Sequence, residues 1–134
     1  VSLSVLVCYE DLLSNLSRDA VLRGAELLVN ITNDAWYGQT QAPYQHNLLA
    51  AFRALETGRY LLRVTNTGLT TVVNPLGEII AELPIFTKGS LVTDVHLLRE
   101  RTPYVQYGDS WTLGLSLIVL AFVALRLRKG SISE

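Results

Sequence analysis

The chain has 134 residues, of which 49% are hydrophobic and 17% are charged, and its formal net charge is −1. A composition this apolar argues against a disordered chain and allows one domain with a substantial buried core. The sequence has no stretch in which Lys and Arg gather with aromatic residues between them, so a nucleic-acid-binding protein is excluded.

Cysteine, histidine and methionine are scarce, with one, two and none respectively. A single cysteine cannot form an internal disulfide, so any role of Cys8 must be that of a thiol. His46 and His96 lack the spacing and the cysteine partners of a metal site, and we predict no metal, no cofactor and no role for either histidine. Because the chain has no methionine and Val1 opens within an apolar run, we expect a piece of a longer protein whose active site extends upstream.

The first part of the chain is predicted to alternate between strands and helices. Val1 to Val7 is short, apolar and rich in β-branched residues, as in a strand buried on both faces. A helix is expected from Glu10 to about Arg23, with Gly24 as its stop, and Leu27 to Ile31 predicts a second buried strand. This order favours an α/β layer built around a sheet.

A loop and a second helix follow. Thr32 to Pro43 is polar, contains Gly, Pro and two large aromatic residues, and is typical of a loop that lines a site. Gln45 to Gly58 has the spacing of an amphipathic helix. On this helix we expect Arg53 and Glu56 to form a structural ion pair rather than a catalytic one.

Short strands are predicted after this helix. Turns rich in Asn, Gly and Pro separate them, so they should form a meander that closes the sheet. The predicted strands are Tyr60 to Thr65, Leu69 to Val73, Ile79 to Leu83 and Leu91 to Val95.

The last segment differs from the rest because Trp111 to Leu125 carries no charge. Extended by two residues, it would rise about 25 Å as a helix, against about 30 Å for the core of a bilayer. We predict a transmembrane helix and a short cytoplasmic tail over 110–134, separate from the α/β domain of 1–109. The cytoplasmic side is favoured by the positive charges that follow the apolar run, namely Arg126, Arg128 and Lys129. A buried core helix is the alternative.

Cys8 is expected at the junction between a strand and the start of a helix, where helix amides and the helix dipole stabilise a thiolate. The nucleophiles of many enzymes occupy such a turn. Glu10 and Asp11 act against this, since neighbouring acids disfavour a thiolate unless a cation offsets them, and the sequence places no cation nearby. The alternative is that Cys8 is a small buried apolar side chain.

Four short motifs occur in order along the chain. They are Val7-Cys8-Tyr9-Glu10, Asn33-Asp34-Ala35-Trp36-Tyr37-Gly38, Arg53-Ala54-Leu55-Glu56 and Arg63-Val64-Thr65-Asn66-Thr67-Gly68. Together with the hydrophobic C-terminal segment, they resemble the nitrilase (carbon–nitrogen hydrolase) superfamily and, within it, the apolipoprotein N-acyltransferases. The resemblance implies the later part of an α-β-β-α sandwich, followed by one transmembrane helix.

The same resemblance implies a Glu-Lys-Cys triad, of which only the cysteine maps onto this chain, at Cys8; the glutamate and the lysine would lie upstream. Tyr9 and Glu10 match positions that support the nucleophile. Trp36, Tyr37 and Asn33 are candidate substrate-binding residues. For these five residues the alternatives are local packing, helix-start electrostatics and the capping of a turn.

The reaction implied by the resemblance is acyl transfer at the bacterial inner membrane, with the catalytic domain facing the periplasm. An acyl chain would pass from a phospholipid to Cys8 as a thioester, and then to the amino group of a diacylglyceryl-cysteine apolipoprotein. Two alternatives stay open. One is a nitrilase-family amidase that hydrolyses a small C–N substrate, although soluble members tend to carry an arginine soon after the cysteine. The other is an inactive, membrane-anchored fragment.

Overall fold

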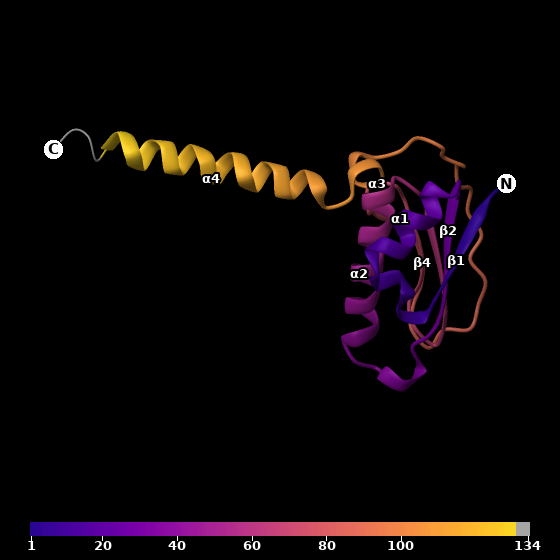
Figure 1. The fold of residues 1–134 in the computed structure, drawn as a ribbon. Helices are drawn as coiled ribbons and strands as arrows, with labels where there is room; N and C mark the ends of the chain where they lie inside the picture. Colours follow the sequence, from indigo (N-terminus) through magenta and orange to yellow (C-terminus); the bar gives the residue numbers. More distant parts are fainter. Residues whose placement is uncertain (131–134) are drawn as a thin grey trace.

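A five-stranded mixed sheet organises the chain in the computed structural model, which describes residues 1–130 (Figure 1). The strands lie in the sheet in their order along the chain, and the first three are parallel whereas the last two are antiparallel to their neighbours. This confirms the predicted α/β layer and its closing meander. The strands are β1 (Leu3–Val7), β2 (Leu27–Asn33), β3 (Leu61–Asn66), β4 (Thr70–Val73) and β5 (Ile79–Leu83).

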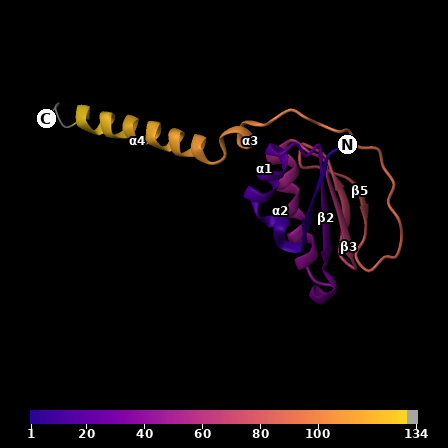
Figure 2. The same ribbon diagram turned by 45° about the vertical axis from the view of Figure 1, so that its right-hand side comes forward.

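Two helices, α1 (Ser14–Leu22) and α2 (Ala42–Thr57), cover one face of the sheet (Figures 1 and 2). The buried face of α2 includes the small residues Ala50, Ala51 and Ala54, which let the helix approach the sheet closely. Gly58 ends α2 in the left-handed conformation, at a φ of 63°, as expected of a glycine C-cap. The buried apolar cluster between the two layers includes Val21, Leu28, Ala50, Ala54, Leu61, Val73 and Val105.

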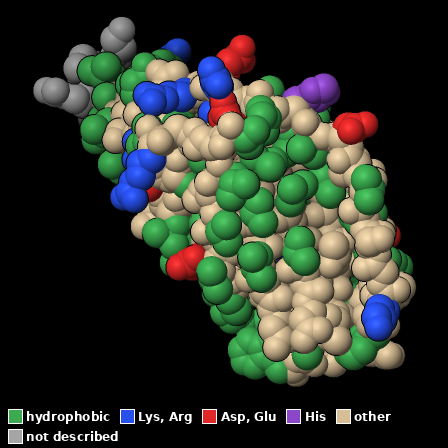
Figure 3. All heavy atoms as spheres, turned by 90° about the vertical axis from the view of Figure 1, so that its right-hand side faces the viewer, with side chains coloured by type: hydrophobic (Ala, Val, Ile, Leu, Met, Phe, Trp, Pro, Cys, Tyr) green, Lys and Arg blue, Asp and Glu red, His purple; other side chains and the backbone are tan. Residues whose placement is uncertain are grey.

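The opposite face of the sheet is also apolar. Val7, Ile31 and Val64 are register partners across β1, β2 and β3, and their exposed fractions are 58%, 53% and 52%. Hydrophobic side chains gather on this side of the molecule (Figure 3). An apolar outer face is typical of a sheet that packs against a further layer.

The predicted helix from Glu10 to Arg23 is two elements in the structure. A 3-10 turn, η1 (Cys8–Leu12), precedes α1, and the extended backbone of Leu13 (φ −91°, ψ 100°) separates them. The prediction missed this break because the apolar spacing runs through it. The turn matters for the site, since it carries Cys8 and the four residues after it.

The predicted strand Leu91–Val95 is wrong. These residues belong to an irregular segment between β5 and a short helix, α3 (Pro103–Tyr107), that the sequence did not predict. The backbone amide of Phe86 donates to Thr67 at one end of the segment, and that of Leu98 donates to Glu26 at the other. The segment therefore runs beside the sheet. Its backbone donates hydrogen bonds to residues next to the strands, and it does not form a ladder with any strand.

A long helix, α4 (Ser110–Gly130), projects away from the α/β layer (Figures 1 and 2). Its described side chains are largely apolar and exposed, among them Leu113, Leu117, Ile118, Leu120, Phe122 and Leu125. A helix was predicted here, but no helix in the part of the chain that the structure describes is long and apolar enough to cross a membrane. Residues 131–134 of the predicted tail lie outside the described residues.

Candidate active site

The carboxyl ends of the three parallel strands meet at one edge of the sheet. β1 ends at Val7, β2 at Asn33 and β3 at Asn66, and the register aligns the last two as partners. Segments that follow parallel strands converge at such an edge, which is where α/β proteins bind their ligands. The turn that carries Cys8 and the loop that carries Trp36 and Tyr37 both begin there.

Cys8 directly follows β1 and begins η1, as the sequence predicted. Its thiol is free and half-buried, and its φ of 53° lies in the left-handed region, which non-glycine residues rarely adopt. Backbone strain of this kind is found at functional sites, where the surrounding structure holds it in place. Asn30 on the neighbouring strand does so here, because its Nδ2 donates to the carbonyl oxygens of Leu6 and Cys8 at 3.2 and 3.0 Å.

Glu10 closes the turn from the other side. Its Oε2 accepts a hydrogen bond of 2.7 Å from the backbone amide of Val7, the residue before the cysteine. The carboxylate thus replaces the missing helical partner of an N-terminal amide, as in a capping box. This contact agrees with the helix-start alternative for Glu10, and it also fixes the backbone on which Cys8 sits.

Four aromatic rings gather beside the cysteine turn, where the sequence predicted only three of them to belong to the site. The ring of Tyr9 stacks on that of His46, with centroids 5.0 Å apart and an interplanar angle of 26°. Trp36 approaches Tyr9 edge-on at 6.3 Å and lies 5.1 Å from Tyr37, and the hydroxyls of Tyr9 and Tyr37 are hydrogen-bonded. Trp36 is 69% exposed and forms the outer rim of this group.

Beneath the rings lies a buried cluster of four charged side chains. His46 Nε2 lies 2.9 Å from Asp11 Oδ1, and His46 Nδ1 lies 3.2 Å from Asp34 Oδ1. Arg63 donates to the other oxygens of the same carboxylates, at 3.4 Å to Asp11 and 3.0 Å to Asp34. All four side chains are buried, and each of the four comes from a different element or loop of the fold.

The contacts in this cluster favour its charged forms. Burial by itself would lower the pKa of His46, but the hydrogen bonds to Asp11 and Asp34 outweigh it and raise the pKa to about 9. Burial would likewise raise the pKa of Asp34, but the hydrogen bonds and charges of His46 and Arg63 hold it below its usual value. Two cations and two anions then balance each other inside the protein.

This cluster corrects two sequence predictions. His46 was assigned no role, yet its ring contacts the residue after Cys8 and both buried carboxylates. Asp11 was expected to lack a nearby cation, yet it pairs with His46 and Arg63. The sequence analysis could not predict these contacts, because no spacing rule relates residues so far apart in the chain. His46 follows Asp11 by 35 residues, and Arg63 follows His46 by 17. The described residues contain no group of three or more His, Cys, Asp or Glu side chains arranged to hold a metal ion.

Asn33, Arg53 and Glu56 make the local contacts that the sequence suggested for them. Asn33 Oδ1 accepts from the amide of Ala35 at 3.1 Å, which is the turn-capping contact weighed as its alternative. Arg53 pairs with Glu56 at 3.0 Å and also donates to the carbonyl oxygen of Leu12 at 2.8 Å, so the structural ion pair is confirmed.

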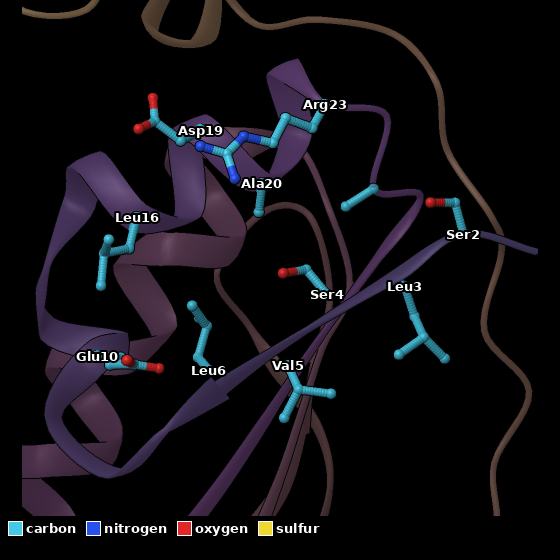
Figure 4. Close-up of a pocket in the computed structure, with 11 residues that line it drawn as sticks. Ser2, Leu3, Ser4, Val5, Leu6, Glu10, Leu16, Asp19, Ala20 and Arg23 are labelled. Atoms are coloured by element: carbon cyan, nitrogen blue, oxygen red, sulfur yellow. The ribbon is translucent and has the colours of Figure 1, made fainter.

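A hollow beside the free edge of β1 is separate from the cysteine turn (Figure 4). It lies between β1 and α1, with Asp19 and Arg23 on one side and the strand residues Ser4 and Leu6 on the other. Glu10 reaches it, but Cys8 is not among its lining residues. We therefore place the candidate site at the carboxyl edge of the sheet rather than in this hollow.

The mixed sheet, the strained cysteine turn and the rings at the carboxyl edge define an α/β protein with a candidate cysteine nucleophile. The profile of the carbon–nitrogen hydrolase family matches residues 1–102. The chain therefore belongs to the carbon–nitrogen hydrolase family, as the four motifs predicted.

Curated relatives and solved structures agree with this assignment. The chain is 46% identical over 130 residues to an apolipoprotein N-acyltransferase of Ralstonia nicotianae, covering 93% of this chain and 25% of the relative. It is 40% identical over 128 residues to an apolipoprotein N-acyltransferase of Methylococcus capsulatus, covering 96% of this chain and 25% of the relative. The chain thus spans about a quarter of the length of the curated relatives that it matches.

Among solved structures, the chain is similar to an E41Q mutant of the amidase from Nesterenkonia sp. AN1, in which acrylamide has added to the active-site cysteine. The TM-score is 0.51 and the identity 30%, over 62% of this chain and 35% of the amidase chain. A carbon–nitrogen hydrolase from Helicobacter pylori gives a TM-score of 0.55 at 19% identity, over 62% of this chain and 36% of that one, and supports the fold alone.

Proposed function

We propose that the protein containing this chain is an apolipoprotein N-acyltransferase with Cys8 as its nucleophile. The observation that carries the proposal is the position of Cys8, a free and half-buried thiol held at a positive φ between a strand and a 3-10 turn. The names of the relatives at 40% to 46% identity support the acyl-transfer chemistry. Because the chain spans a quarter of their length, the activity is proposed for the whole protein.

The first half-reaction would transfer an acyl chain from a phospholipid to Cys8. The thiolate sulfur attacks the carbonyl carbon of the acyl ester, a C–S bond forms, and the C–O bond to the glycerol backbone breaks. The leaving lysophospholipid takes the proton that the thiol gave to a general base. The resemblance assigns this base to a glutamate and the balancing cation to a lysine, both upstream of Val1.

The second half-reaction would use the thioester to acylate a lipoprotein. The free amino group of a diacylglyceryl-cysteine apolipoprotein attacks the thioester carbonyl, an amide bond forms, and the C–S bond breaks. The proton lost by the amine returns the sulfur to its thiol form. No cofactor or metal takes part in either half-reaction.

The residues around Cys8 would position the nucleophile and border the substrates. Glu10 holds the backbone of the turn through the amide of Val7, and Tyr9 forms the base of the aromatic group. Trp36, the most exposed ring of the group, and Tyr37 offer an apolar border for an acyl chain or a lipoprotein substrate. Asn33 would act through its loop, whose first turn it caps.

We propose that the reaction takes place at the bacterial inner membrane, with the domain of 1–109 facing the periplasm. Both substrates carry acyl chains, and the exposed apolar side chains of α4 are suited to contact with lipid.

The test of the reaction uses the full-length protein and a phospholipid with a clickable acyl chain. We expect a label on the peptide that contains Cys8, and treatment with neutral hydroxylamine should remove it because the bond is a thioester. Cys8→Ala should abolish the label, and Cys8→Ser should carry either none or an ester that resists hydroxylamine. A hydroxylamine-sensitive label that persists unchanged in Cys8→Ser would rule out Cys8 as the acyl carrier.

The second candidate function is that of an amidase, favoured by the 30% identity to the Nesterenkonia enzyme with its active-site cysteine. The full-length protein can be tested for this activity by measuring ammonia, because an amidase would release ammonia from small amides such as acetamide in a Cys8-dependent reaction. The third alternative, an inactive protein that only binds, predicts neither ammonia nor a label. Acyl transfer predicts the label and no ammonia.

A further inference from the structure

His46 lies at the point where the two loops of the candidate site meet. Through Nε2 it contacts Asp11, which belongs to the same 3-10 turn as Cys8. Through Nδ1 it contacts Asp34, which directly precedes the turn that carries Trp36 and Tyr37. One imidazole ring therefore joins the nucleophile turn to the aromatic loop.

The geometry favours the form of His46 in which both ring nitrogens carry hydrogen. Each nitrogen faces a carboxylate oxygen, and a carboxylate can only accept. A neutral ring would turn a lone pair toward one of the two aspartates, at a distance where two acceptors repel each other. The imidazolium form instead donates to both.

The ring also contacts the aromatic side chains directly. Tyr9, the residue after the nucleophile, stacks on the ring, and Tyr37 meets it nearly perpendicularly with centroids 6.5 Å apart. A cation against aromatic rings is favourable when it is shielded from water, so the charge of His46 strengthens both contacts. The hydrogen bond between the two tyrosine hydroxyls completes the connection above the ring.

We propose that His46, as an imidazolium, is a positioning residue for the reaction at Cys8, because it holds the Cys8–Asp11 turn and the Trp36–Tyr37 loop in register with each other. It does not touch the sulfur, and it acts through Asp11 and Tyr9. This inference rests on the proposed function for the identity of the reaction, but the geometry on which it depends is independent of the substrate.

The groups that face His46 come from every element around it. They are Asp11 and Tyr9 from η1, Asp34 from the end of β2, Tyr37 from η2 and Arg63 from β3. The carboxylates favour the cation and Arg63 opposes it, and the balance raises the pKa of His46 to about 9. Loss of the proton above that pH leaves two aspartates with only Arg63 between them, and the turn and the loop should then loosen.

The test measures how fast chloroacetamide, a small neutral electrophile, alkylates Cys8 in the full-length protein between pH 7 and pH 10. Wild type is compared with His46→Gln and with the matched control His96→Gln, since His96 is exposed and outside the site. At pH 7 we expect His46→Gln to slow alkylation at least about tenfold, because small displacements at a reacting group cost large factors in rate. The rates should converge above about pH 9, where the wild-type imidazolium loses its proton, and His96→Gln should match wild type throughout.

A merely structural role for His46 would give a different result, namely a wild-type to variant ratio that is constant across this pH range. That result, or equal rates at pH 7, would overturn the proposal. If His46→Gln does not fold, ring-nitrogen NMR of the wild-type protein decides the question, since a neutral His46 at pH 7 also contradicts it.

Alkylation of Cys8 and phospholipid labelling, measured on the same protein samples, test the role of His46 and the acyltransferase activity separately. Alkylation needs no substrate, whereas the clickable phospholipid reports acyl transfer. A label at Cys8 with a constant alkylation ratio would retain the acyltransferase and reject the role of His46. Convergence of the alkylation rates without any label would retain the role of His46 and reject the acyltransferase.

Discussion

The side-chain Nδ2 of Asn30 donates a hydrogen bond of 3.0 Å to the backbone carbonyl oxygen of Cys8. Asn30 is fully buried in β2, at a position aligned with Leu6 of β1, whose carbonyl oxygen it also binds. Beyond the end of the β1–β2 ladder, the backbone carbonyl oxygen of Cys8 therefore accepts its hydrogen bond from a side-chain amide. It holds the strained backbone of the cysteine turn from a neighbouring strand, which explains why a polar residue occupies the middle of a buried strand.

Replacing Asn30 by leucine should therefore both destabilise the protein and disturb the cysteine turn. Asn30→Leu keeps the branched shape of the side chain, with more bulk, but removes the amide that donates to the carbonyl oxygens of Leu6 and Cys8, which costs on the order of 2 kcal/mol or more. Chemical denaturation measures this loss, and alkylation of Cys8 measures the disturbance. The control is Asn33→Ala, which removes only an exposed turn contact and should cost less than about 1 kcal/mol. Equal losses in the two variants would contradict the special role of Asn30.

Gly68 is expected to tolerate no side chain, because it packs against Asp34 of the buried cluster. A Cβ added at Gly68 would lie 2.6 Å from both Cβ and Oδ2 of Asp34, closer than atoms can approach. Since His46 and Arg63 hold the carboxylate, Gly68→Ala should cost about 1 to 3 kcal/mol. Gly114 on α4 has nothing within 4 Å, so Gly114→Ala should be neutral or stabilising in the same unfolding experiment. A harmless Gly68→Ala would show that Asp34 can move freely.

The buried cluster should make stability depend on pH at both ends of the scale. The folded protein raises the pKa of His46 from 6.5 to about 9, so the stabilisation from this group is complete below pH 6.5 and is lost as the pH rises through about 9. For Asp34, whose pKa is lowered, the stabilisation is present above its usual value near 3.8 and is lost as the pH falls below it. We expect the free energy of unfolding to fall between pH 6.5 and pH 9.5. His46→Gln should flatten this slope, and an equal slope in the variant would assign it to other groups.

The sequence predicted the layer well because the relevant signals are local. Short β-branched runs, a polar loop and helical spacing identified the parallel strands, α2 and the meander, and the register then brought Cys8 and the Trp36–Tyr37 loop to one edge. The strand expected at Leu91–Val95 failed because an apolar run alone does not supply a partner strand, and the bonds that tie this segment to the fold come from Phe86 and Leu98 on either side of it. Local pattern cannot tell these two cases apart.

The chemistry of the site was harder to predict, because it depends on side chains that meet only in the folded chain. The sequence identified Cys8, Tyr9 and the aromatic loop, yet treated Asp11 as an unbalanced acid. Its partners, His46 and Arg63, come from α2 and β3. A buried aspartate or histidine is stable only when paired, so the signal was present in the requirement for a partner but not in the spacing.

Arg59 provides a last test, because it joins the end of α2 to the irregular segment of residues 84–102. The side chain is buried, and its guanidinium donates to the carbonyl oxygens of Ala25 at 2.9 Å, Gly58 at 3.0 Å and Glu100 at 2.6 Å. Arg59→Met keeps the apolar stem but leaves these acceptors unpaired, and should cost about 3 kcal/mol. Leu98 lies in the same segment as Glu100, and its amide donates to the backbone carbonyl oxygen of Glu26. Hydrogen exchange at this amide should also become faster in Arg59→Met.

The matched control is Arg23→Met, since Arg23 is exposed at the C-terminal end of α1 and the change should stay within about 0.5 kcal/mol. If exchange at Leu98 is unchanged in Arg59→Met while stability falls, Arg59 supports α2 alone and the segment is held by Arg99 and Glu26 instead. If both change together, a single buried guanidinium links the helix that carries His46 to the segment that crosses the sheet edge.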